Sequence, residues 1–362
     1  MEAKLVLEDG EIFVGKSCGI PGTAFGEVVF NTSMNGYQEI MTDPSYAGQI
    51  VTFTYPLVGN YGVHGSYQES AASWAQGIIV KELCTAPGGS RIDKKLQAFL
   101  EEQRLVGICD IDTRTLTKHL RVMGTMRGII TTEDIPVEEL TKKAQSIPHL
   151  SEIDLVAKVT CEKPYILPGG QTTVAVIDMG VKHNILRSLT SRGCTVVVLP
   201  AKTAYEDIMK YSPQGIILSN GPGDPKTVSY VANTVKKLLG KVPIMGICMG
   251  HQVLGIALGG ETFKLKFGHR GGNHPVKNLQ TGRVDITSQN HGFALKEEGL
   301  PHDVEITHVN LNDGTVEGIE HKNLPAFSIQ YHPEGAPGPH DSRNLFDKFL
   351  YMVEGDRGDQ SA

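Results

Sequence analysis

The chain has few cysteines, no long apolar run and no excess of basic residues. Its six cysteines are scattered through 362 residues without a Cys-x-x-Cys pair, which suits a reducing compartment and argues against a disulfide framework or a cysteine-rich zinc module. No stretch approaches the ~20 apolar residues that span a bilayer, and the first residues lack the apolar core of a signal peptide. We therefore expect a cytoplasmic protein.

The overall composition is that of an ordinary globular protein with room for two domains. Hydrophobic residues make up 40% of the sequence and charged residues 20%. The formal net charge of −6 gives no reason to expect a nucleic acid or an anionic membrane as a partner.

Cys248 is the most informative residue, because it stands between an apolar run and a helical pattern. Residues 242–247 are typical of a buried strand and residues 253–258 of a helix, so the cysteine is expected on a tight turn between them. Gly246 and Gly250 give such a turn room, as in the nucleophile elbow of the α/β-hydrolases. A thiol there faces free N–H groups and the positive end of the helix dipole, which favour the thiolate. The pattern predicts a nucleophile.

A general base for this nucleophile is offered where a strand pattern runs into Pro333. Residues two apart in extended backbone share a face, so His332 and Glu334 can point to the same side. With Cys248 they provide a nucleophile, a general base and a carboxylate that orients the imidazole. The alternative for either residue alone is structural: Cys248 as a small buried apolar residue, or His332 as a satisfied histidine at a strand end.

Three motifs together resemble those of the triad class of glutamine amidotransferases. They are Gly246-Ile-Cys-Met-Gly-His-Gln252, Gln330-Tyr-His-Pro-Glu334 and Ser219-Asn-Gly-Pro-Gly-Asp-Pro225. The resemblance implies hydrolysis of the side-chain amide of glutamine through a cysteinyl thioester. It also implies a catalytic triad of Cys248, His332 and Glu334.

The third motif follows the strand pattern of residues 215–218. The bare backbone N–H groups of its Gly-Pro-Gly turn, with the N–H of Met249, would stabilise the oxyanion formed when Cys248 attacks an amide carbonyl. Taken alone, Gly221 and Gly223 would be interpreted as a plain turn.

The pattern of elements divides the chain into two domains. From about residue 173 strands and helices alternate, which predicts an α/β domain with a mostly parallel sheet covered by helices and Cys248 at a strand's carboxyl end. After Gly260 we expect short strands and turns, with a hairpin at Asn312-Asp-Gly314. The first 150 residues predict a separate, smaller α+β domain. The expected bounds are an N-terminal partner-docking domain at 1–150, a linker at 151–171, the amidotransferase domain at 172–355 and a disordered tail at 356–362.

The N-terminal half carries a second resemblance. Residues 30–46, 50–60, 110–114 and 116–119 closely resemble the amino-terminal domain of the small, glutamine-hydrolysing subunits of carbamoyl phosphate synthetase. Apart from its tail, the chain is identified as a member of that family. The resemblance implies that ammonia passes through a protein tunnel to a large synthetase subunit.

That large subunit would bind ATP and Mg²⁺ and make carbamoyl phosphate from bicarbonate, for pyrimidine or arginine biosynthesis, while this chain would need no cofactor. Two alternatives stay open. The chain could serve another synthetase, such as those that make GMP or anthranilate, or it could be a non-catalytic glutamine-sensing subunit.

The resemblance also implies a set of residues that hold glutamine: Ser45, Gly221, Gly223, Met249, Gln252, Asn290, Gly292 and Phe293. Gln252 is four residues after Cys248 and therefore on the same helix face. Residues 289–293 are expected to form a polar loop after a strand at 284–287. Ser45 would have to cross the domain interface, and its alternative role is capping of a helix or turn.

Two other patterns are expected to carry no function. Residues 10–17 match the phosphate-loop pattern G-x-x-x-x-G-K-S, but their middle positions look like a strand and no helix can begin after them. His269 and His274 could suggest a metal site, as could Cys248 with His251. No acidic or cysteine ligands cluster with residues 269–274, and Cys248-x-x-His251 lacks a second pair. We therefore expect a polar loop beside the site and no metal.

Overall fold

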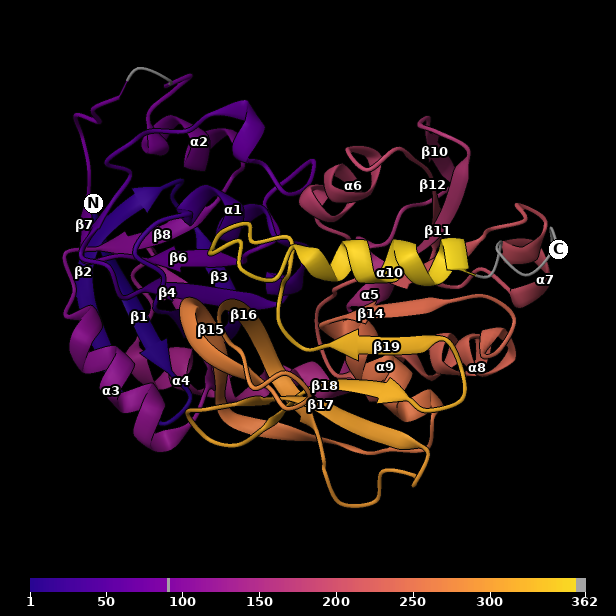
Figure 1. The fold of residues 1–362 in the computed structure, drawn as a ribbon. Coiled ribbons are helices and arrows are strands. Elements are labelled where there is room, and N and C mark those ends of the chain that lie inside the picture. Colours follow the sequence, from indigo (N-terminus) through magenta and orange to yellow (C-terminus); the bar gives the residue numbers. More distant parts are fainter. Residues whose placement is uncertain (90–91, 356–362) are drawn as a thin grey trace, which may run out of the picture. The chain divides into compact units, whose positions relative to one another are not determined.

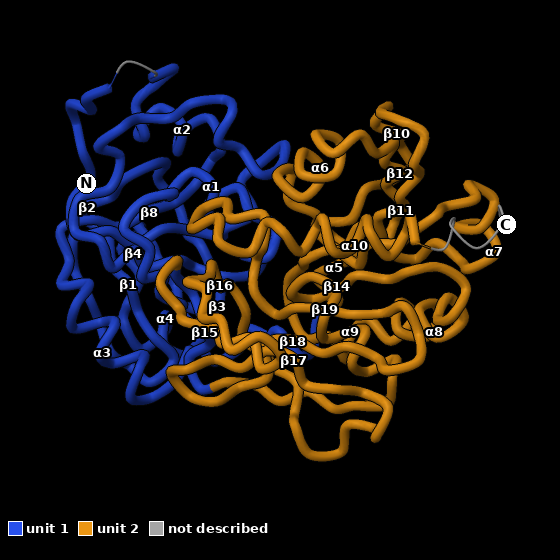
Figure 2. Tube along the Cα trace, in the orientation of Figure 1, with its two compact units in different colours: residues 1–153, 266–271 blue, residues 154–265, 272–362 orange. Residues whose placement is uncertain are grey.

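The protein is described from a computed structural model, in which residues 1–89 and 92–355 are described. The chain forms two compact units, residues 1–153 with 266–271 and residues 154–265 with 272–362 (Figure 2). The tail expected at 356–362 lies outside the described residues. Within the described part, every helix is too short or too polar to cross a membrane.

Unit 1 is built on a closed barrel with the strand order β1-β2-β8-β6-β4-β3-β9. Its strands are β1 (Glu2–Leu7), β2 (Ile12–Gly19), β3 (Thr23–Asn31), β4 (Gln49–Phe53), β6 (Gly77–Ile79), β8 (Val106–Cys109) and β9 (Met126–Thr131), with a small pair of β5 (Leu57–Val58) and β7 (Glu82–Leu83). Its helices are α1 (Tyr37–Thr42), η1 (Pro44–Tyr46), η2 (Gly65–Tyr67), α2 (Leu96–Glu102), α3 (Thr113–Met123), α4 (Val137–Ser146) and η3 (Leu150–Glu152).

The phosphate-loop pattern lies in β2 and not in a loop. Lys16 pairs with both Glu2 of β1 and Cys109 of β8, and Ser17 pairs with Ile108. This segment therefore has the strand conformation expected from its sequence, and its backbone N–H groups are not arranged around a phosphate.

Unit 2 contains a ten-stranded sheet with the order β10-β12-β11-β13-β14-β19-β18-β17-β15-β16. The strands are β10 (Tyr165–Leu167), β11 (Thr172–Asp178), β12 (Cys194–Pro200), β13 (Gly215–Leu218), β14 (Ile244–Ile247), β15 (Thr262–Asn278), β16 (Val284–Leu295), β17 (Val304–Asn310), β18 (Val316–His321) and β19 (Ala326–Ile329). From β12 to β19 the neighbouring strands pair in parallel, whereas β10 and β18 join antiparallel. The carboxyl ends of the five parallel strands therefore lie at one edge.

Helices cover both faces of the parallel part (Figure 1). They are α5 (Val156–Val159), α6 (His183–Thr190), α7 (Tyr205–Met209), η4 (Pro225–Val228), α8 (Ser229–Leu238), α9 (Met249–Ala257) and α10 (Asn344–Gly355). Alternate residues of β11 belong to different cores: Val174 and Val176 pack with α6 and α10, while Ala175 and Ile177 pack with α7, α8 and α9. Both faces of each strand are thus buried, which explains their nearly continuous apolar sequence.

The region after Gly260 contains the long strands β15 and β16 and not only short ones. Two segments that were expected to be polar loops belong to these strands: residues 269–274 lie within β15, and residues 289–293 continue β16. The prediction of a loop at residues 289–293 was wrong because buried polar side chains there find hydrogen-bond partners in the protein, so Gln289 and Asn290 need not face water. The hairpin at residues 312–314 is confirmed, since it joins the antiparallel strands β17 and β18.

Candidate active site

Cys248 lies between β14 and α9 in a strained backbone conformation. Its φ is 54° and its ψ is −104°, a region that costs a residue with a side chain about 1–3 kcal/mol. Two hydrogen bonds hold the turn: the N–H of Cys248 donates to Ile329 O over 2.9 Å, and the N–H of Gly250 donates to Ser219 O over 3.0 Å. The turn is thus fixed to strand β19 on one side and to the end of β13 on the other.

The two glycines of the motif are required by close backbone contacts. A Cβ at Gly250 would lie 2.1 Å from Leu218 O, and one at Gly246 would lie 2.5 Å from Gly250 O. Neither position can hold a side chain without moving backbone atoms. The Cys248 thiol itself is buried and lies 3.5 Å from Asn290 O of β16.

His332 and Glu334 meet just beyond β19, and a lysine joins them. His332 Nδ1 lies 2.7 Å from Glu334 Oε1, and Lys182 Nζ lies 2.6 Å from the same oxygen. Asn184 holds the backbone of Glu334 by donating from Nδ2 to its carbonyl over 2.7 Å. All three charged side chains are almost fully buried, so the carboxylate is held in place from two sides.

Neighbouring groups outweigh burial for both His332 and Glu334. Burial and the Lys182 cation lower the pKa of His332, but Glu334 and Cys248 together raise it more, and the pKa ends above its usual range. Burial raises the pKa of Glu334, but Lys182 and His332 overcome this and hold it well below its usual range. Nothing in the described chain hydrogen-bonds His332 Nε2, the ring nitrogen not bound to Glu334.

Lys182 was not found from the sequence. Lysines are common and mostly exposed, and the Lys182–Glu334 contact joins residues 152 positions apart. The available signal was its position four residues after the end of β11, at the same sheet edge as Cys248.

The loop of residues 219–225 is bound to the segment that carries Lys182. Ser219 Oγ accepts a hydrogen bond from Met179 N over 2.9 Å, and Asn220 Oδ1 accepts one from Lys182 N over 3.1 Å. Gly221 lies so near this segment that a Cβ would be 2.3 Å from Met179 O, and Gly223 has a left-handed φ of 87°. The two glycines therefore have conformational reasons beyond a plain turn.

Strand β16 supplies the other side of the cysteine turn. Gln252 Nε2 donates to Phe293 O over 2.7 Å and to Gln330 Oε1 over 3.0 Å. The contact of Cys248 with Asn290 O comes from the same strand. Gln252, Asn290 and Phe293, expected together at one site, thus lie near one another, and Gly292 lies between the last two in β16.

Ser45 belongs to unit 1, where it lies in the short helix η1. The capping residue of this helix is Asp43, whose Oδ1 accepts the N–H of Ser45 over 2.9 Å. The capping role considered for Ser45 therefore belongs to Asp43. Ser45 is 6% exposed.

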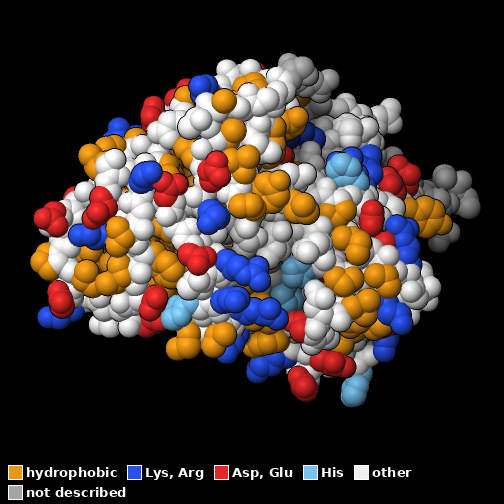
Figure 3. Space-filling view, turned by 90° about the vertical axis from the view of Figure 1, so that its left-hand side faces the viewer, with side chains coloured by type: hydrophobic (Ala, Val, Ile, Leu, Met, Phe, Trp, Pro, Cys, Tyr) orange, Lys and Arg blue, Asp and Glu red, His pale blue; other side chains and the backbone are white. Residues whose placement is uncertain are grey.

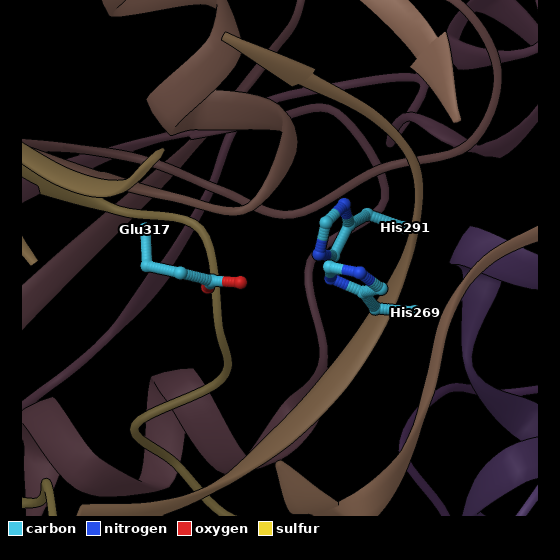
Figure 4. A group of neighbouring side chains, drawn as sticks. All are labelled: His269, His291 and Glu317. Atoms are coloured by element: carbon cyan, nitrogen blue, oxygen red, sulfur yellow. The ribbon is translucent and has the colours of Figure 1, made fainter. Parts of the chain in front are cut away.

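His291 and Glu317, which could offer ligands to a metal, have hydrogen-bond partners in unit 2. Figure 4 draws His291 and Glu317 of this unit with His269, which belongs to the segment counted with unit 1. Gln289 connects the two residues of unit 2: its Oε1 lies 3.0 Å from His291 Nε2, and its Nε2 donates to Glu317 Oε2 over 2.9 Å. Asn310 Nδ2 donates to the other oxygen of Glu317 over 2.9 Å. A metal would have to displace these bonds, and the expectation of no metal stays a prediction.

His251, one turn from the cysteine, is completely buried. Its Nδ1 lies 2.9 Å from Ser328 Oγ, and burial lowers its pKa to about 3. The ring is therefore neutral at physiological pH and is held by β19.

Two family models match this chain, one in its N-terminal and one in its C-terminal part. The family model of class-I glutamine amidotransferases matches residues 175–352, and that of the carbamoyl-phosphate synthase small chain, CPSase domain, matches residues 5–130. The chain is 50% identical to the carbamoyl phosphate synthase small chain of Syntrophotalea carbinolica, over 99% of this chain and 100% of that protein. It is 51% identical to that of Aquifex aeolicus, over 98% and 99%, and 50% identical to that of Akkermansia muciniphila, over 98% of each. The chain belongs to the family of carbamoyl phosphate synthase small chains.

Proposed function

We propose that this chain hydrolyses L-glutamine to L-glutamate and ammonia and supplies the ammonia to a large synthetase chain for carbamoyl phosphate synthesis. The observation that carries the proposal is a strained, buried Cys248 at the end of β14 and, just beyond the neighbouring strand β19, a His332 ring that Glu334 orients over 2.7 Å. A cysteine, a histidine and a carboxylate in this order are a nucleophile, a general base and its orienting group. The turn of Cys248 then serves as a nucleophile elbow.

In the first step the sulfur of Cys248 attacks the side-chain carbonyl of glutamine, and His332 receives the thiol proton. The ring passes this proton to the departing nitrogen, so ammonia leaves and a glutamyl thioester remains. The carboxylate of Glu334 and the raised pKa of His332 let the ring keep the proton between these events. Water, deprotonated by His332, then attacks the thioester; glutamate leaves and the thiol is restored.

The oxyanion of each tetrahedral intermediate requires N–H donors close to the sulfur. The N–H groups on both sides of Met249 are already used, by Ile329 O and by Ser219 O. The N–H of Met249 is at the start of α9, where helix N–H groups lack partners within the helix. We therefore assign it the role of oxyanion donor, together with the N–H groups of Gly221 and Gly223.

Glutamine itself would be held by the residues around this turn. Gln252, Asn290, Gly292 and Phe293 belong to the elements that contact the cysteine turn, which supports their assignment. Ser45 would add a contact from unit 1.

The synthesis of carbamoyl phosphate uses ATP, and residues 12–17 of the phosphate-loop pattern lie in strand β2, where they do not form a loop around a phosphate. We therefore assign the use of the ammonia to a partner chain. ATP and Mg²⁺ would act on the large chain, and this chain would need no cofactor. A docking role for unit 1 is supported by the match of its residues 5–130 to the family model of the carbamoyl-phosphate synthase small chain, CPSase domain. Figure 3 shows one face of the molecule, with hydrophobic side chains among charged ones and Lys and Arg gathered near its middle.

The proposal is tested by trapping the thioester. The chain, in complex with its large partner, is mixed with isotopically labelled glutamine and quenched in acid, and the labelled peptide is identified by mass spectrometry. We expect the label on the peptide of Cys248 and on none containing Cys161, a half-buried cysteine of the same unit that serves as internal control. Ammonia release without a label, or no reaction in a folded complex, would contradict the proposal. The second result would favour a glutamine-sensing subunit instead.

A further inference from the structure

Gln330 is a buried residue of the site to which no role has been assigned. It follows β19 directly and lies two residues before His332, with no exposed surface. Its backbone N–H donates to Glu317 O over 2.8 Å, which fixes the position of the residue. Its side chain points to Gln252, whose Nε2 lies 3.0 Å from Gln330 Oε1.

The two hydrogens of the Gln252 amide are both committed within the protein. One is donated to Phe293 O over 2.7 Å and the other to Gln330 Oε1. A backbone carbonyl can only accept, so the nitrogen of Gln252 must face Phe293. The orientation of the amide follows from this, and Oε1 is the polar atom that Gln252 keeps for a ligand.

A reversed Gln330 amide would place two N–H donors against those of Gln252. The observed orientation avoids this, although it leaves Gln330 Nε2 buried and without a hydrogen-bond partner among the described residues. A buried N–H group without a hydrogen-bond partner is unfavourable. The hydrogen bond from Gln252 to Gln330 Oε1 is thus formed although the Nε2 group of Gln330 has no partner among the described residues.

We propose that Gln330 is a positioning residue, which holds Gln252 so that Gln252 Oε1 accepts a hydrogen bond from an N–H group of the substrate glutamine. This inference rests on the proposed function, because it takes Gln252 to be a glutamine ligand. Gln330 touches neither the substrate nor the sulfur in this role. Its removal affects binding of glutamine more than the chemical steps.

The test compares glutaminase kinetics of the full chain in its complex with the large chain. Gln330→Met keeps the length of the side chain and removes the acceptor. One hydrogen bond corresponds to a rise in KM of several-fold, up to roughly tenfold, and kcat should stay within about twofold. Gln330→Glu keeps an oxygen acceptor at this position and should restore a KM near that of the natural chain. A purely structural role would not separate KM from kcat or distinguish these two variants.

A double-mutant cycle with Gln252→Met gives the deciding result. If Gln330 acts through Gln252, the double variant should have the KM of Gln252→Met alone. The inference would be overturned if the effects of the two substitutions on KM were additive in free energy, or if Gln330→Met left KM unchanged. In both cases Gln252 would keep its proposed role. An unchanged KM in Gln252→Met would remove that residue from the proposed function, and the inference with it.

Thermal unfolding verifies that each variant is folded. Carbamoyl phosphate synthesis from added ammonium verifies that it is assembled with the large chain. Should Gln330→Met fail to fold, Gln330→Asn takes its place, because it withdraws the acceptor by one methylene and keeps an amide. It must then raise KM in the same way.

Discussion

Lys182 and His332 bind the same oxygen of Glu334, at 2.6 and 2.7 Å. A carboxylate with one partner could rotate and present its other oxygen to the imidazole. With two cationic partners on Oε1 it is fixed, and so is the ring that it orients. The His332–Glu334 pair is therefore supported by a third charged side chain, that of Lys182 from the loop after β11.

Lys182→Met should lower the stability of the fold and disturb the Glu334 carboxylate that orients His332. It removes the cation nearest to a fully buried carboxylate, and breaking such a buried pair costs roughly 3–5 kcal/mol of unfolding free energy. The pKa of Glu334 should rise. As the pH is lowered, the variant should therefore lose glutamine turnover at a higher pH than the natural chain does. Chemical denaturation and a pH profile of kcat/KM check both effects. Lys163→Met, at an exposed lysine, is the control, and an unchanged acid limb in Lys182→Met would show that the lysine does not act on the triad.

Glu334→Gln should reduce stability in a way that depends on pH. The folded-state pKa of Glu334 lies below its ordinary value of 4.5, so its charge contributes stability above that value. The contribution is lost as the pH falls through the lower, folded-state pKa. The difference in unfolding free energy between the natural chain and the variant should therefore be largest above pH 4.5 and shrink below it.

The matched variant Glu162→Gln changes an exposed carboxylate and should show no such dependence. A difference that grows as the pH falls would mean that the sign of the Glu334 shift is wrong. Urea unfolding at several pH values provides the measurement.

Much of this site could be predicted because its signals are local. Gly246 and Gly250 mark the cysteine turn within five residues, and their necessity is confirmed by carbonyl oxygens at 2.5 and 2.1 Å from a Cβ. The alternation of apolar strand patterns with helical patterns likewise predicted the elements from β11 to α9. These strands are recognisable because each is buried on both faces and is therefore almost continuously apolar.

The unpredicted features depend on contacts between distant residues. Closure of the barrel in unit 1 pairs β1 with β9, more than 120 positions later, and no local pattern encodes that register. The continuation of β16 through residues 289–293 depends on partners such as Glu317, which a reading of local polarity cannot supply. Lys182 was missed for the same reason.

Gly250→Ala should disrupt the cysteine turn. The new Cβ would lie 2.1 Å from Leu218 O, so α9 must shift away from β13. We expect a loss of about 3 kcal/mol in unfolding free energy, with glutaminase activity reduced even where the protein is folded, because Cys248 moves with the helix. Gly88→Ala, where a Cβ would meet no atom of the described residues within 4 Å, should be neutral. Normal stability and normal kcat in Gly250→Ala would show that the close contact is not needed.

Ser45→Ala tests the one proposed glutamine ligand from unit 1. If its hydroxyl binds glutamine, KM should rise by a factor corresponding to about 0.5–1.5 kcal/mol, with a smaller loss of kcat. Stability should change little, because the cap of η1 is Asp43 and the backbone N–H that it binds is kept. Ser146→Ala, at an exposed serine, is the control. An unchanged KM would remove Ser45 from the site.

Cys248→Ala separates catalysis from assembly. It removes the nucleophile but little volume from a buried position, so the chain should fold and still bind the large chain. The complex should then fail with glutamine and yet make carbamoyl phosphate from bicarbonate, ATP and added ammonium, since the partner's chemistry uses ammonia from either source. Cys161→Ala should keep both activities. Loss of both in an assembled Cys248→Ala complex, verified by gel filtration, would mean that the cysteine does more than hydrolyse glutamine, and the assignment of the two reactions to separate sites would have to be abandoned.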